Sequence, residues 1–175
     1  SSDLRSMAWA LLKTRLAVGR RSPEDLLELP EATDPILCGI QEIQTLATLS
    51  QGRLHPEAIP LAILRDVRTV LADGVTASGA QCWTGYGLIL CALFGQVELG
   101  RRYAELALQQ VERLRRPDLF PRIATFAYFL VFPWSTPIAE VSRLLRDAVT
   151  KAFAVGDIEA AFFARTVADR VDYYS

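Results

Sequence analysis

The sequence predicts an all-α protein made of antiparallel helix pairs, stacked as a TPR-like right-handed superhelix or as an α-α bundle. Residues 85–114 and 144–171 each predict two helices that fold back on each other, with turns at Gly95 and Gly156. On both sides of these turns apolar residues recur every three or four positions, which is the period of one helix face. Strand patterns are essentially lacking in the sequence.

Small residues follow the two turn glycines at matched distances. Gly100 and Ala161 come five positions after the glycine, and Ala107 and Ala168 come twelve positions after it. Small side chains let another helix approach closely, and this spacing is that of the second helix of a TPR repeat. Asp157 directly follows Gly156 and is a good N-cap for the next helix. Because the aromatic and proline positions of a strict TPR are missing, an ordinary antiparallel hairpin stays open as the alternative.

Four further helices are expected before the first hairpin. The first begins at Asp3, ends near Gly19, and has an inward face of Leu4, Met7, Ala8, Leu11, Leu12 and Leu16. The second is short and begins with a capping box, in which Ser22 is the cap and Pro23 and Asp25 follow. The third begins at Asp34 and Pro35, ends at Gly52, and points Ile36, Leu37, Ile40, Ile43, Leu46 and Ala47 inward. The fourth begins at His55-Pro56 and ends at Asp73-Gly74.

Between the two hairpins, the sequence predicts one helix that is apolar on nearly every side. It covers residues 119–132 with Asp118 as its cap, and a helix apolar all round is expected to be buried. Thr136 and Pro137 are expected to cap and open the helix that begins at Ile138. We expect a single TPR-like helical domain over residues 1–175. Since its first and last helices lack the polar outer face of capping repeats, we expect a fragment of a larger multi-domain protein.

Composition narrows the functional classes. The net charge is −1, which argues against a nucleic-acid-binding surface. The longest apolar run, Phe126 to Trp134, is far shorter than the roughly 20 residues of a membrane span. Three scattered cysteines, Cys38, Cys82 and Cys91, predict buried thiols in a reducing compartment, hence a cytoplasmic location.

The sequence offers no catalytic constellation, and we expect neither a cofactor nor a metal. His55 is the only histidine, so a zinc site or a Cys-His pair is hard to build. The glycines at 85, 87, 95 and 100 follow no strand pattern and precede no lysine, so helix packing explains them better than a phosphate loop. We therefore expect a protein that is not an enzyme.

Aromatic and basic residues near the helix ends are the candidates for contacting a partner. Trp83, Tyr86 and Trp134 are large aromatic residues that could line a groove and anchor a protein or peptide. The alternative is that they are wedged between helices. The pair Arg101-Arg102 could contact an acidic partner, and a solvated helix face is its alternative.

Three stretches together resemble the helical region of large STAND-type signal-transduction ATPases. They are SPEDLLELPEATDP, YGLILCALFGQVELGRRYAELAL and PWSTPIAEVSRLLRDAVTKAFAVGDIEAAFFA, within residues 22–170. The short motifs that this sequence shares with that family are Leu29-Pro30, Asp34-Pro35, Tyr86-Gly87, Trp134 with Pro137, and Gly156-Asp157. Members of this family join a nucleotide-binding module to a TPR-like array, and many carry kinase, GAF or cyclase domains. The resemblance implies no active site here, since the chain contains no GxxxxGK[ST] phosphate loop.

The sequence thus favours a non-enzymatic TPR-like protein-interaction and regulatory domain of a signalling ATPase or kinase. Its expected partner is a protein or peptide, or another domain of the same polypeptide, and neither nucleic acid nor membrane. Two alternatives stay open. One is a domain that senses a small-molecule inducer in an apolar pocket near Trp134 and the helix of residues 119–132. The other is a homodimerisation module that covers its exposed apolar surface.

Overall fold

The computed structural model of this chain describes residues 2–173, and within them it confirms the all-α prediction. The α-helices are α1 (Ser2–Val18), α2 (Pro23–Leu27), α3 (Pro35–Leu54), α4 (Ile59–Asp73), α5 (Gln81–Phe94), α6 (Val97–Arg113), α7 (Phe120–Phe126), α8 (Ile138–Ala154) and α9 (Ile158–Tyr173). Three short segments complete them: η1 (Pro56–Ala58), η2 (Ala127–Val131) and η3 (Phe132–Trp134). The extended residues of the described part pair only at an isolated bridge between Glu31 and Val75.

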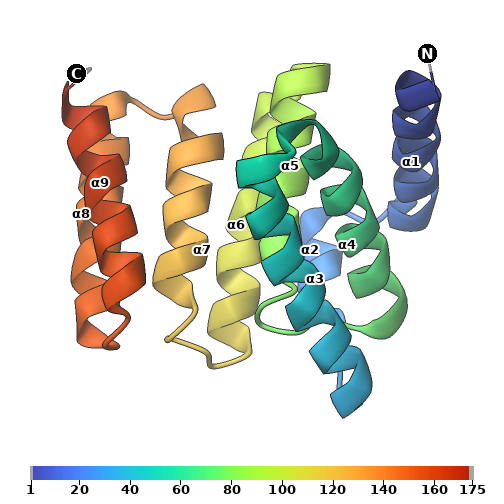
Figure 1. Cartoon of the computed structure of the whole chain (residues 1–175), viewed down its shortest axis with the longest axis horizontal. Helices are drawn as coiled ribbons and strands as arrows, with labels where there is room; N and C mark the ends of the chain where they lie inside the picture. Colours follow the sequence, from blue (N-terminus) through green and yellow to red (C-terminus); the bar gives the residue numbers. More distant parts are fainter. Residues whose placement is uncertain (1, 174–175) are drawn as a thin grey trace.

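The helices stand side by side in a row (Figure 1). Helix α1 is at one end next to α4, the α5–α6 hairpin lies in the middle, and the α8–α9 hairpin forms the other end. Two apolar clusters fill the spaces between them, one around α4, α5 and α6 and one around α7, α8 and α9. The half-buried side chains of Leu108 and Phe120 pack against both clusters, so the core continues along the row.

Both predicted hairpins form, with their turns at the predicted glycines. Gly95 has φ +63° and Gly156 has φ +75°, the left-handed conformation that favours glycine at a helix end. Asp157 caps α9, because its Oδ1 accepts a hydrogen bond of 2.9 Å from the backbone N–H of Ala160. These turns depend on neighbouring residues only, which is why the sequence predicts them well.

The α5–α6 hairpin is held together by a close approach of two glycines. A Cβ placed on Gly87 would lie 2.4 Å from the carbonyl oxygen of Gly100. A Cβ placed on Gly100 would lie 2.6 Å from the carbonyl oxygen of Gly87 and 2.4 Å from the Sγ of Cys91. The expectation that Gly100 lets a second helix approach closely is therefore confirmed. The other small repeat positions, Ala107, Ala161 and Ala168, are buried in the same way at the helix interfaces.

The predicted helix of residues 119–132 forms, but it changes geometry along its length. It begins as α7, widens to a π-helix in η2 and tightens to a 3₁₀-turn in η3. Two predicted caps were wrong. Asp118 does not cap this helix, because its carboxylate pairs with Arg116 and the cap position is Leu119. Thr136 does not cap α8, because its hydroxyl is buried and accepts a hydrogen bond from Arg101.

The inward faces predicted for α1 and α3 were wrong in most positions. Helix α3 points Gln41 into the protein, and it leaves Ile36, Ile40, Ile43 and Leu46 exposed. Helix α1 buries Ala10, Thr14 and Val18, whereas Leu4, Leu12 and Leu16 are exposed. The limits also differ, because α3 continues past Gly52 to Leu54 and α1 begins at Ser2, before Asp3. The apolar residues of both helices are spaced correctly for a helix face, but the fold turns those faces outward.

Candidate functional site

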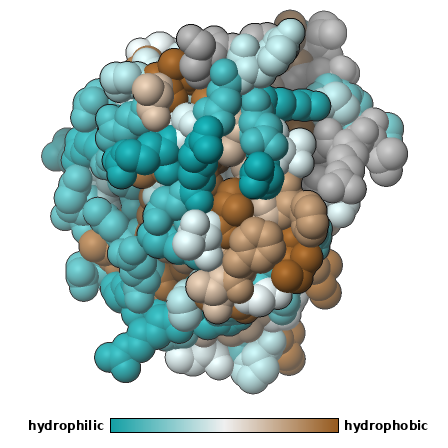
Figure 2. All heavy atoms as spheres, turned by 90° about the vertical axis from the view of Figure 1, so that its left-hand side faces the viewer, coloured by the Kyte–Doolittle hydropathy of each residue, from teal (hydrophilic) through white to brown (hydrophobic). Residues whose placement is uncertain are grey.

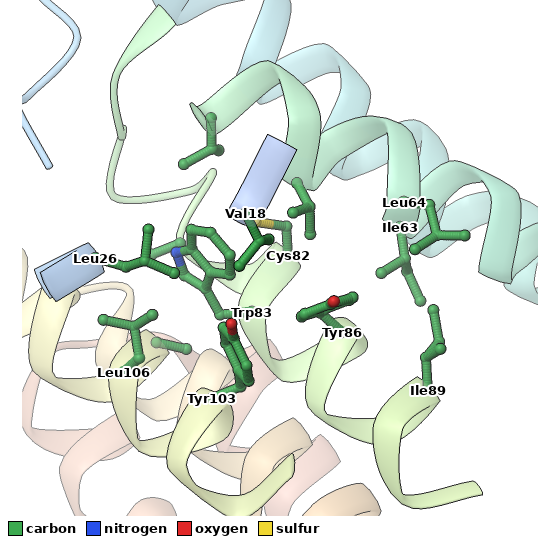
Figure 3. Packing of buried hydrophobic residues seen from close by; sticks show 14 of the residues in the cluster. Val18, Leu26, Ile63, Leu64, Cys82, Trp83, Tyr86, Ile89, Tyr103 and Leu106 are labelled. Atoms are coloured by element: carbon green, nitrogen blue, oxygen red, sulfur yellow. The ribbon is translucent and has the colours of Figure 1, made fainter. Parts of the chain in front are cut away.

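Trp83 and Tyr86 belong to the core and present no surface to a partner, so their assignment to an exposed groove was wrong. Trp83 is 0% exposed and Tyr86 is 5% exposed. The Trp83 ring stacks on Tyr103 at a centroid distance of 5.8 Å, and the Tyr86 ring meets Tyr103 edge-on at 4.9 Å. Figure 3 shows these rings between α5 and α6, beside Leu26 and Val18. For these two residues the alternative interpretation, aromatic side chains wedged between helices, is confirmed.

A chain of hydrogen bonds satisfies the polar atom of Trp83 inside this core. Its Nε1–H donates to Oε1 of Gln110 at 2.8 Å, and Nε2 of Gln110 donates to the carbonyl oxygen of Leu26 at 2.9 Å. Gln110 is itself fully buried. Buried polar groups need hydrogen-bond partners. These two hydrogen bonds supply them only while α2 stays packed against the α5–α6 hairpin, so they hold α2 in place. Burial raises the pKa of the Tyr103 hydroxyl to about 12 and also raises the pKa of Tyr86.

Arg101 and Arg102 connect elements of the domain itself. The guanidinium of Arg101 donates to Oε1 of Glu105 at 3.0 Å and to Oγ1 of Thr136 at 2.7 Å, and it lies over the ring of Phe132. Arg102 pairs with Glu24 of α2, and this pairing lowers the pKa of Glu24 to about 2. Both arginines therefore pair with carboxylates of the domain itself, and an acidic partner would have to compete with those carboxylates.

Trp134 is the one predicted aromatic candidate that reaches the surface. It is 49% exposed at the end of η3, and its Nε1–H donates to the carbonyl oxygen of Leu130 at 3.1 Å. Ile138, at the beginning of α8, is also exposed. The structure thus separates Trp134 from Trp83 and Tyr86, and the five predicted partner-contacting residues do not form one site.

The outward face of α3 is the clearest candidate contact surface. Ile36 is 73% exposed and Ile43 is 68% exposed, with Ile40 and Leu46 exposed beside them. The opposite face is held by polar contacts. Gln41 donates to the carbonyl oxygen of Gly74 at 2.8 Å and accepts from the N–H of Thr76, while Thr48 donates to Asp66 at 2.7 Å. Hydrogen bonds with defined geometry thus orient α3, and its aliphatic side is left uncovered in this chain.

The two ends of the row also expose apolar side chains. On α1, Leu4 is 78% exposed and Leu16 is 71% exposed, with Trp9 and Leu12 also exposed. At the other end, Phe153, Val155, Ile158, Phe162 and Phe163 are exposed around the α8–α9 turn. Figure 2, seen from the α8–α9 side, shows a group of apolar atoms at the lower right of the view, with hydrophilic atoms over most of its left and upper parts. Contiguous exposed apolar surface of this kind usually marks a contact site.

A cavity of about 390 Å³ lies where α6, the following loop and the end of α8 meet. Val111, Phe120 and Val155 supply apolar walls, and the charged lining residues are Glu112, Arg115, Lys151 and Arg116, the last of which pairs with Asp118. Arg115 has φ +54°, the only positive φ of a non-glycine residue in the described part of the chain. Lys151 lies over the Phe120 ring, 4.7 Å from its centroid. The sequence-based expectation placed a pocket near Trp134 and the helix of residues 119–132. The cavity lies beside Phe120, at the beginning of that helix, and Trp134 is not among its lining residues.

The histidine and the three cysteines are the side chains most often used in nucleophilic catalysis. His55 is exposed, and its Nδ1 lies 3.2 Å from Oε1 of Glu57. Cys82 and Cys91 are buried, and burial raises the pKa of both thiols, while Cys38 is partly buried. Over the residues that the structure describes, no three His, Cys, Asp or Glu side chains come together as a potential metal site. No helix in that same part is both long and apolar enough to cross a bilayer.

Comparison of the chain with protein-family models, with curated proteins and with solved structures finds no match to any of them. The assignment of function therefore depends on the surfaces themselves. The exposed faces of α1 and α3 were missed from the sequence, because an apolar stripe looks the same whether it faces inward or outward. Polar residues such as Gln41 on the opposite side of α3 were the available signal.

Proposed function

We propose that this chain is a non-enzymatic, TPR-like interaction and regulatory domain, and that it serves a cytoplasmic signalling ATPase or kinase. The observation that carries the proposal is the outward aliphatic face of α3. Ile36, Ile40 and Ile43 are exposed on a helix whose polar side is fixed to the domain. Burying such side chains in an interface is favourable by roughly 25 cal/mol per Å² of apolar area, so a protein surface is a suitable occupant.

The arrangement of the helices in a row supports this function, because it forms an extended surface. Each helix pair contributes a rigid strip, and a stack of such strips presents an extended surface to a partner (Figure 1). The hydrogen bonds from Gln41 and Thr48 keep α3 in one orientation before any partner arrives. A contact surface that is already ordered loses little conformational entropy on binding.

Photo-cross-linking tests the proposal. A benzoylphenylalanine placed at Ile43, in cells that contain the natural partners, should give a defined adduct with another protein or another domain of the same polypeptide. The adduct should disappear when Ile36 and Ile40 are replaced by glutamine, and the same probe at the exposed Thr150 of α8 is the control. The identified partner should then bind the purified chain in calorimetry. Equal adducts from both positions, or none from position 43, would count against an interaction function for α3.

The cavity beside Phe120 favours sensing of a small ligand as a second candidate function. Its volume of about 390 Å³ lies within the range of ligand pockets, and it combines apolar walls with Arg115 and Lys151. A thermal-shift screen distinguishes the two functions, because a small ligand that binds the folded state raises the melting temperature by mass action. Dimerisation is the third possibility, and light scattering over a dilution series measures it directly.

A further inference from the structure

The segment of residues 4–21, which covers α1 after its first two residues and the turn that follows it, carries a concentration of positive charge that the rest of the chain does not share. Residues 4–21 contain five cations, Arg5, Lys13, Arg15, Arg20 and Arg21, and no carboxylate. The whole chain has 19 Lys and Arg against 20 Asp and Glu, so the other residues hold 14 cations and 20 carboxylates, a net charge of −6. The basic character of this chain is therefore gathered at the end of the row formed by α1 (Figure 1).

The exposed cations of α1 take part in no ion pair with a carboxylate whose side chain the structure describes. Arg5, Lys13 and Arg15 form none of its ion pairs, whereas Arg101, Arg102, Arg122 and Arg146 each bind a carboxylate of the fold. Lys13 lies instead over the exposed ring of Trp9, with its Nζ 5.0 Å from the ring centroid. The polar contacts of α1 with the domain come from its other side, where Thr14 donates to the carbonyl oxygen of Leu64 and accepts from Arg68.

The apolar residues of the same face form a ridge suited to helix packing. Leu4, Ala8, Leu12 and Leu16 are spaced by four residues, and all four are exposed. Rows of side chains with this spacing are the ridges that fit into the grooves of a neighbouring helix. The small side chain of Ala8 leaves a hole between Leu4 and Leu12 into which a side chain of a second helix can fit.

The position of Arg5 decides between a protein helix and a lipid surface. Arg5 is four, seven and eleven residues from Trp9, Leu12 and Leu16, so it lies within the apolar face and not at its edge. A lipid surface would bury this cation among acyl chains, which is costly. A helix with carboxylates beside its own apolar ridge can pair with Arg5, Lys13 and Arg15 while it covers the leucines.

We infer that the outer face of α1 binds an acidic amphipathic helix, whose apolar ridge packs on Leu4, Leu12 and Leu16 and whose carboxylates pair with Arg5, Lys13 and Arg15. This inference rests on the proposed interaction function and names the chemistry of one partner. It uses a different helix from α3, so the two can fail separately. The ridge and the unpaired cations are the whole recognition element, so a simple designed helix suffices as a probe.

The test uses the fluorescence of Trp9 in the complete chain. Trp83 is fully buried and Trp134 is replaced by phenylalanine, so Trp9 becomes the exposed reporter. The probe is a synthetic amphipathic helix with a leucine ridge flanked by glutamates. The first control peptide has lysines in place of the glutamates, and the second has the same composition in scrambled order. The glutamate peptide should shift Trp9 emission to the blue and protect it from quenching, and neither control peptide should do so.

Two sets of variants then assign the binding to α1. Reversal of charge by Arg5→Glu, Lys13→Glu and Arg15→Glu should weaken binding at least about tenfold, as should Leu4→Gln with Leu16→Gln. The matched control reverses Arg143, Arg165 and Arg170 on α8 and α9 and should leave the affinity unchanged. Since every replaced side chain is exposed, circular dichroism should be unaltered. Raising the salt concentration from about 0.1 M to about 0.5 M should weaken binding severalfold, because exposed charges are screened.

Three results would overturn the inference. One is a Trp9 shift that is equal with the glutamate and lysine peptides, or absent with both. Another is a shift produced by vesicles of phosphatidylserine but not by the glutamate peptide, which would assign α1 to a membrane surface. The last is concentration-dependent self-association that Leu4→Gln with Leu16→Gln abolishes, which would assign the face to a second copy. None of these results bears on a partner that cross-links to α3.

Discussion

Replacing Gly100 by alanine tests the close approach of α5 and α6, on which the central hairpin depends. The new methyl group would lie 2.6 Å from the carbonyl oxygen of Gly87 and 2.4 Å from the Sγ of Cys91. The sulfur can turn away, but the backbone oxygen can move only if the helices separate. Overpacking of this kind costs about 1–3 kcal/mol, whereas alanine gains about 1 kcal/mol over glycine in a helix. We take the upper end of the cost, because a backbone atom is hit, and expect a net loss of about 2 kcal/mol.

Gly39 in α3 is the matched control for this substitution. A Cβ at Gly39 meets nothing within 4 Å, and its φ lies outside the positive range. The Gly39→Ala variant therefore keeps the helix-propensity gain without a clash, and it should be more stable by about 0.5–1 kcal/mol. The same chemical change is thus expected to have opposite signs at the two positions.

Urea unfolding and thermal unfolding, both followed by far-ultraviolet circular dichroism, measure the change in stability of the two variants. For a chain of this length, a loss of 2 kcal/mol corresponds to a fall in melting temperature of about 4–8 °C. The reasoning would be refuted if Gly100→Ala were as stable as the parent, or if Gly39→Ala lost as much stability as Gly100→Ala. A stable Gly100→Ala variant would mean that α5 and α6 can separate at little cost in free energy. An equally destabilised Gly39→Ala variant would mean that the clash with Gly87 is not the cause of the lost stability.

Three further predictions concern the core, the alkaline limit and a helix cap. Trp83→Phe leaves a buried acceptor without its donor and should cost about 1–3 kcal/mol in urea unfolding, whereas Trp134→Phe at the surface should change stability by less than about 0.5 kcal/mol. The pKa of Tyr103 is raised from 10.0 to about 12, so its contribution to stability is complete below pH 10 and is lost as the pH rises to about 12. A pH series should show this decline above pH 10, and it should be shallower in Tyr103→Phe; an equal slope in both proteins would contradict the assignment. Asp157→Ala removes the cap of α9 and should cost about 1 kcal/mol, whereas Asp169→Ala, at an exposed ion pair, should cost at most about 0.5 kcal/mol; equal losses would show that the cap is not what matters.

The sequence predicted best those features that depend on a few neighbouring residues. The turns at Gly95 and Gly156, the Asp157 cap and the capping box of Ser22 with Asp25 all form as expected. Each is a contact between residues at most a few positions apart, so its chemistry is visible in a short window. The two wrong caps, at Asp118 and Thr136, fail because longer or competing contacts take those side chains, to Arg116 in one case and to Arg101 in the other.

The candidate site was predicted less well, because aromatic residues suit both a groove and a core. Trp83 and Tyr86 lie on α5, which has buried side chains around most of its circumference. On such a helix the sequence gives no solvent side, and only the neighbouring helices decide which residues are covered. Trp134 lies at the last position of η3 and is 49% exposed, a difference from Trp83 that the residue type alone does not reveal.

The sequence by itself determined that the chain is helical, where its two hairpins turn, and which small residues allow close packing. It did so because backbone hydrogen bonds, glycine conformation and helix caps are local. Only the tertiary structure decided which side of α1 and of α3 faces the core. An amphipathic stripe specifies a face but not its direction. For α3 the direction was set by partners 33 and 35 residues away, the backbone groups of Gly74 and Thr76 that bind Gln41.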